Sequence, residues 1–84
     1  MRYKIKDDQV VAIEVRDGVI QKRATWLTDL LYNGTIRLSS VQVLLCLEGV
    51  TTSIVNGWII RYCKSGLVEL CTVDKFKEKF EVMS

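Results

Sequence analysis

Three cysteines are the residues of this chain best suited to bind a metal or attack a substrate: Cys46, Cys63 and Cys71. None forms a C-x-x-C pair, and the chain contains no histidine that could complete a mixed zinc site. The missing histidine also removes the commonest general base, and no phosphate-binding loop or nucleophile motif is present. We therefore expect reduced thiols, two of them in the core, with no metal, no cofactor and no enzymatic activity.

The composition is that of one small globular domain. The 84 residues carry 12 basic and 10 acidic side chains, which gives a net charge of +2, and 49% of the residues are hydrophobic. Residues 1–84 are therefore predicted to form a single domain. The longest unbroken apolar run, Val43–Leu47, is too short to span a bilayer, and the first residues lack the apolar stretch of a signal peptide. We expect no membrane contact and a cytoplasmic location.

The first 23 residues predict a β-hairpin or meander. Val11, Ile13 and Val15 alternate with small or polar residues, which is the two-residue period of a half-buried strand. Asp17-Gly18 follows directly and strongly indicates a tight hairpin turn. Residues 1–23 are therefore expected to form an N-terminal extension that packs on the remainder of the chain.

From residue 24 the spacing of apolar residues becomes helical. Leu27, Leu30 and Leu31 share one helical face, with Thr25 as the expected N-cap and Asn33-Gly34 as the stop. Residues 35–38 then predict a short β-type link.

Two further helices are predicted after this link. Ser39 and Gln42 have the spacing of a capping box, so a helix is expected to run to Gly49. Thr51 would cap the next helix, over residues 51–65, and Gly66 would end it. Residues 67–73 and 76–83 are of β type and predict two strands.

This order of elements resembles a winged helix-turn-helix. Gly49-Val50-Thr51 is similar to the G-V-S opening of the recognition helix in DeoR-like and MarR-like repressors. Gly66-Leu67-Val68 is similar to the G-L-[VI] that closes this helix, and the distance between the two glycines matches. The resemblance covers about residues 37–82. It implies an α+β fold in which residues 24–84 form three helices with a C-terminal β-wing, preceded by the N-terminal hairpin.

The resemblance also implies which residues would contact double-stranded DNA. On the recognition helix these positions are Thr51, Thr52, Ser53, Asn56, Gly57 and Ile60, with Arg61 and Lys64 near the phosphates. Asparagine can bond adenine in the major groove, and hydroxyl groups can bond base edges or phosphate. Lys75 and Lys77 alternate with Phe76, so they could contact phosphate from the wing. They could equally form the solvated side of an ordinary strand.

Two functions remain open at this point. A dimeric transcription regulator would place the helix 51–65 in the major groove, although a net charge of +2 offers little phosphate neutralisation. The same helix would carry more apolar residues than one face can bury, and surplus apolar surface is typical of protein interfaces. We expect a DNA-binding homodimer. The alternative is a winged-helix module that binds another protein, as a small inhibitor or adaptor, and does not bind DNA.

Overall fold

Antiparallel strands are the main secondary structure of this chain in the computed structural model, which describes residues 2–5, 8–79 and 81–82, and the side chains of residues 10–78. The first half of the chain contains β1 (Arg2–Ile5), β2 (Asp8–Arg16), β3 (Val19–Ile20), α1 (Thr25–Asn33) and β4 (Ile36–Leu38). The second half contains β5 (Val43–Leu47), β6 (Val50–Ile54), β7 (Gly57–Tyr62), β8 (Val68–Thr72), α2 (Val73–Lys79) and β9 (Glu81–Val82).

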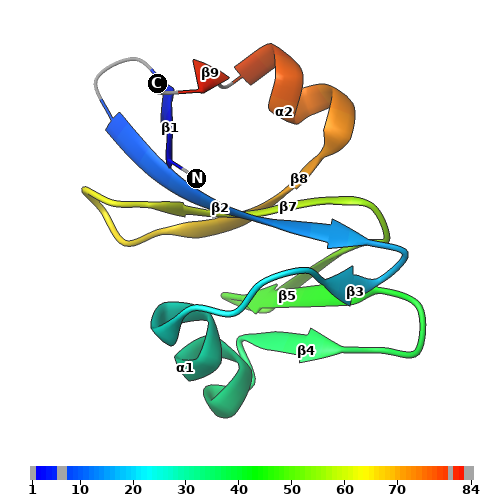
Figure 1. The fold of residues 1–84 in the computed structure, drawn as a ribbon. Coiled ribbons are helices and arrows are strands. Elements are labelled where there is room, and N and C mark those ends of the chain that lie inside the picture. Colours follow the sequence, from blue (N-terminus) through cyan, green and yellow to red (C-terminus); the bar gives the residue numbers. More distant parts are fainter. Residues whose placement is uncertain (1, 6–7, 80, 83–84) are drawn as a thin grey trace.

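The strands form two sheets that lie face to face (Figure 1). The larger sheet has the order β8-β7-β2-β1-β9, with β3 paired to the end of β2, and the smaller has the order β4-β5-β6. Figure 1 shows α2 on the side of the larger sheet that faces away from the smaller one, while α1 lies beside the smaller sheet. The smaller sheet and α2 thus cover opposite faces of the larger sheet.

The larger sheet therefore buries side chains on both of its faces. Ile13, Val15 and Ile59 point from its inner face into the main core, where they meet the smaller sheet and Leu27 of α1. Ile60 points the other way, into a second core beneath α2. Neighbouring residues Ile59 and Ile60 are both fully buried because each lies on a different covered face.

The winged helix-turn-helix prediction is wrong, because the two helices it requires after residue 38 are strands. Residues 39–48 contain β5, and residues 51–65 contain most of β6 and all of β7. The second predicted wing strand, over 76–83, coincides mostly with α2, and its residues 80 and 83 lie outside the described residues. For residues 51–65 the physical reason is the high proportion of β-branched residues, which pack well on a pleated surface but lose side-chain freedom in a helix. Residues 39–48 contain few β-branched residues, and β5 is a strand there because it pairs with both β4 and β6.

A tight turn at Glu48-Gly49 joins β5 to β6, where the helix-turn-helix would have its own turn. Both residues have positive φ, 50° for Glu48 and 78° for Gly49. Positive φ at both central positions is what a type I′ hairpin turn requires. The predicted capping box before β5 is instead a turn in which the Ser39 N–H donates to the Gln42 carbonyl, at 2.9 Å.

The predicted N-terminal strands and the first helix are confirmed, but the strands do not form an extension, because β2 pairs with β7 in the middle of the larger sheet. β1, β2 and β3 pair in sequence, and Asp17-Gly18 forms the predicted turn with φ of 53° and 75°. Helix α1 ends at Gly34, whose φ of 84° is left-handed. Thr25 is the first residue of α1, so Ala24 occupies the N-cap position that the sequence analysis assigned to Thr25.

Helix α2 begins where β8 ends, at a capping residue that the sequence analysis did not use. The Thr72 hydroxyl oxygen accepts a hydrogen bond from the Lys75 N–H at 3.4 Å, and Asp74 lies in the first turn. Phe76 stacks on Trp58 of β7, with ring centroids 4.4 Å apart and an interplanar angle of 13°. This stack holds α2 against the outer face of the larger sheet.

Candidate functional site

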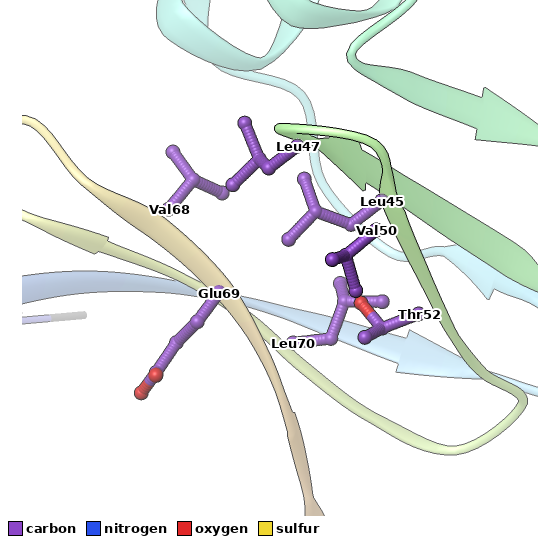
Figure 2. A pocket seen from close by; sticks show the side chains of 7 residues that line it. All are labelled: Leu45, Leu47, Val50, Thr52, Val68, Glu69 and Leu70. Atoms are coloured by element: carbon purple, nitrogen blue, oxygen red, sulfur yellow. The ribbon is translucent and has the colours of Figure 1, made fainter.

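An apolar groove of about 340 Å³ lies between the β5–β6 hairpin and β8 (Figure 2). Its lining residues are Leu45, Leu47, Val50, Thr52, Val68, Glu69 and Leu70. In Figure 2 the side chains of the hairpin face those of Val68 and Leu70, whereas the carboxylate of Glu69 points away from them. Leu45 is only 5% exposed and belongs to the main core, so it forms the inner end of the groove. Val50 is 61% exposed and lies at the rim of the groove.

The alternation of side chains along the strands explains why the groove is apolar. Leu45 pairs with Thr52 and Leu47 pairs with Val50, so these four side chains lie on one face of the hairpin. On β8, Val68 and Leu70 share the inner face, and Glu69 lies on the outer face. There its carboxylate accepts a hydrogen bond from the Tyr62 hydroxyl at 2.6 Å, which keeps the charge out of the groove.

Both strands that flank the groove are sheet edges. β6 is the last strand of the smaller sheet and β8 is the last strand of the larger one. They run alongside each other without ladder pairing in the part of the chain that the structure describes. The groove therefore lies between two edges at which backbone groups are available to a further strand.

The hydrogen-bonding pattern shows which backbone groups these are. In an antiparallel pair, residues alternate between directing their N–H and C=O towards the partner strand and away from it. The Tyr62 N–H donates to the Leu67 carbonyl at 2.8 Å, so Leu67 directs its backbone groups towards β7. By alternation, Val68 and Leu70 direct their N–H and C=O groups away from β7. Leu47 and Val50 flank the Glu48-Gly49 turn and therefore direct their backbone groups towards each other. By alternation, the N–H and C=O groups of Thr51 and Ser53 point away from β5.

The residues predicted to contact DNA do not share a surface. Thr51, Thr52 and Ser53 are exposed, but they lie on edge strand β6 and not on a helix. Lys75 and Lys77 are exposed on α2, which covers the far face of the other sheet. The structure therefore separates the predicted base contacts from the predicted wing contacts.

Three of the predicted DNA contacts have structural roles. Ile60 has no exposed surface and belongs to the core beneath α2. Gly57 is buried at the start of β7, where it pairs with Thr72 of β8, and a Cβ there would collide with the Cys71 carbonyl oxygen. Asn56 accepts a hydrogen bond from the Asp17 N–H at 2.9 Å through its side-chain oxygen, which ties the β6–β7 turn to the β2–β3 turn.

The last two predicted contacts, Arg61 and Lys64, lie at the end of β7 and in the turn that follows it. Arg61 is half-buried and Lys64 is exposed. Neither lies on a helix that could enter a DNA groove, so the predicted docking geometry is wrong for them as well.

Sequence reasoning missed the residues that line the groove. The signal that could have found them is Glu48-Gly49, which lies between the apolar run 43–47 and the mostly β-branched residues 50–54. A glycine in a two-residue link between two β-type segments is consistent with a hairpin turn, and this interpretation competes with the glycine that ends a helix. The register of this hairpin would have placed Leu45, Leu47 and Val50 on one face.

The structure also places the three cysteines. Cys71 is buried in the core beneath α2, Cys46 is half-buried and Cys63 is exposed. Among the described residues, no group of three histidine, cysteine or acidic side chains lies close enough together to hold a metal ion. In the same part of the chain, neither helix is long and apolar enough to cross a membrane.

Comparison of this chain with protein-family models, with curated proteins and with solved structures finds no match. The groove and the two strand edges are therefore the features from which a function can be argued.

Replacing Asn56 by alanine is expected to lower the free energy of unfolding by about 1 kcal/mol, because the Asp17 N–H loses its acceptor. Urea unfolding of the purified variant measures this loss. Ser53→Ala is the control, because Ser53 is exposed on β6 and a change there is expected to stay within about 0.5 kcal/mol. Equal stability of the two variants would contradict the structural role of Asn56.

Proposed function

We propose that the protein is an interaction module that binds an extended, apolar segment of a protein in the groove between β6 and β8. The observation that carries this proposal is the combination of an apolar groove with the two strand edges that border it. Main-chain hydrogen bonds to an edge provide affinity, and the groove receives alternate side chains of the added strand. The proposal includes a cytoplasmic location, which the exposed thiol of Cys63 favours.

The exposure of the groove residues supports this function. Val50 is 61% exposed and Leu47 is 40% exposed, although both are large apolar side chains beside a cavity. Burying such side chains against a partner contributes about 25 cal/mol for each Å² removed from water.

A selection from a library of random linear peptides, with the immobilised full chain as bait, tests the proposal. The selected peptides are expected to alternate apolar and polar residues, because an added strand turns every second side chain into the groove. The Val50→Lys variant is expected to bind these peptides at least tenfold more weakly, since it places a charge at the apolar rim. Fluorescence anisotropy of labelled peptides measures the change in Kd.

Val19→Lys is the matched control for this experiment. Val19 lies on β3, away from the groove, and its exposure of 59% is close to the 61% of Val50. The control is expected to bind the selected peptides as the unmodified protein does. Equal weakening in both variants, or a selection that enriches no peptide, would sink the proposal.

Binding to duplex DNA stays a prediction, although it no longer has a recognition helix to carry it. A titration of random-sequence duplex at low and moderate salt tests it with the same preparation. Binding that weakens steeply as salt rises would indicate phosphate contacts and would favour a DNA role over a peptide-binding one.

A further inference from the structure

Strand β6 is an edge without the features that usually prevent strands from pairing with other chains. Its five residues, Val-Thr-Thr-Ser-Ile, include no charge and no proline, and its register with β5 is unbroken. Thr51, Thr52 and Ser53 are all exposed, and no described strand besides β5 pairs with β6. Natural proteins generally blunt such edges with charges, proline, bulges or short strands.

The other edges of the described sheets do carry such features. β3 and β9 have two residues each, and β4 has three residues with Arg37 at its centre. β8 carries the charged residue Glu69 and continues directly into α2. Strand β6 therefore stands out as the edge at which pairing is least opposed.

The residue types of β6 are symmetric about Thr52. Thr51 and Ser53 flank it with hydroxyl side chains, and Val50 and Ile54 are β-branched apolar residues at the ends. The backbone groups share this symmetry, because those of Thr51 and Ser53 point outward and those of Thr52 point towards β5. An antiparallel strand related by a two-fold axis at Thr52 would meet matching residue types and matching hydrogen-bonding groups at every position.

We infer that the occupant of this site is a second copy of the chain, whose β6 pairs with β6 around a two-fold axis at Thr52. This inference rests on the proposed function, because it names the partner of the same site. Thr51 pairs with the partner's Ser53 and exchanges both backbone hydrogen bonds with it, and the symmetric pair does the same. The two smaller sheets then form one continuous sheet across the axis.

The side chains are compatible with this register. The two Thr52 side chains lie directly opposite each other, and threonine pairs at such positions are favourable. Val50, which is 61% exposed, meets the partner's Ile54, on the same face as the groove. Since β6 carries no charge, the pairing sets no like charges opposite each other.

The expected dimer is weak. A strand of five residues is roughly 17 Å long, so this pairing and the groove rim bury less than a standard interface of about 1,600 Å². The dimer is therefore expected to dissociate on dilution, and its population is expected to depend on protein concentration.

Sedimentation velocity of the full chain, from about 5 µM to about 500 µM, measures this self-association. The unmodified protein is expected to shift from monomer to dimer over this range. Thr52→Lys and Thr52→Glu are each expected to weaken the dimer at least tenfold, because the axis sets like charges face to face. An equal mixture of the two variants is expected to restore a dimer, since opposite charges then meet.

A matched pair controls for the effect of charge alone. Thr28→Lys and Thr28→Glu change an exposed threonine on α1, and both are expected to dimerise as the unmodified protein does. Circular dichroism melts show whether each variant is folded. If a Thr52 variant does not fold, Thr51→Lys replaces it and is expected to weaken the dimer, because a lysine on an edge strand opposes pairing with another chain. The Thr51 side chain points away from the groove, so this variant keeps the groove intact.

The outcomes separate this inference from the proposed function. A monomer at every concentration, or a dimer that the Thr52 variants leave unchanged, overturns pairing through β6. If selected peptides still bind the monomer and depend on Val50, the interaction module stands and its occupant is a different protein. If no peptide binds and no dimer forms, both proposals fail.

Discussion

Replacing Gly18 by alanine is expected to lower the free energy of unfolding by about 2–4 kcal/mol, because two costs combine at this position. Gly18 has a φ of 75°, which strains a residue with a side chain. In addition, a Cβ at Gly18 would collide with the Val41 carbonyl group and lie 2.9 Å from the Gln42 nitrogen. Urea unfolding followed by tryptophan fluorescence measures the loss.

Gly49→Ala separates the two costs. Gly49 has nearly the same φ, 78°, but nothing lies within 4 Å of the position its Cβ would occupy. Replacing Gly49 by alanine is therefore expected to lower the free energy of unfolding by about 1 kcal/mol, which is the cost of the positive φ alone. Equal losses at the two glycines would show that the β2–β3 turn does not pack against the loop before β5 as the structure has it.

Replacing Ile60 by alanine is expected to lower the free energy of unfolding by about 2–5 kcal/mol, as for other large side chains in a core. Ile60 has no exposed surface and packs with Val10, Ala12, Cys71 and Phe76 beneath α2. The truncation removes these contacts and leaves a cavity that rigid neighbouring strands cannot fill. The midpoint temperature of thermal unfolding is expected to fall by roughly 4–8 °C for each kcal/mol of stability lost.

Two controls test this role of Ile60. Ile60→Val removes one methyl group and is expected to cost about 1 kcal/mol. Leu38→Ala removes an apolar side chain that is 52% exposed on β4, so it is expected to change stability much less. If Ile60 instead lay on a surface facing DNA, Ile60→Ala would leave the unfolding free energy nearly unchanged, and this result would contradict the structure.

The sequence alone predicted the elements whose local signals agree with one another. Asp17-Gly18 follows an alternating run, so turn chemistry and strand period both predict the hairpin of β2 and β3. In α1, Leu27, Leu30 and Leu31 share one face, and Gly34 provides the left-handed end. No tertiary contact was needed to choose between structures there.

For residues 39–62 the local signals conflicted, and tertiary packing decided between them. Val43–Leu47 is apolar throughout, and the period of such a short run does not distinguish a strand from a helix. A helix would have left some of Ile54, Trp58, Ile59 and Ile60 exposed. The β7 strand buries Ile59 on one face and Ile60 on the other, because the smaller sheet and α2 cover both faces of the larger sheet.

The groove and the open edge of β6 likewise depend on tertiary structure. The sequence identifies Thr51, Thr52 and Ser53 as polar, but their role depends on whether a neighbouring strand pairs with β6. Leu47 and Val50 face Val68 and Leu70 only because two edges from different sheets run alongside each other. Strand pairing between residues distant in sequence depends on how the whole core packs. Short-range sequence patterns can predict a turn or the end of a helix, but they do not predict this pairing.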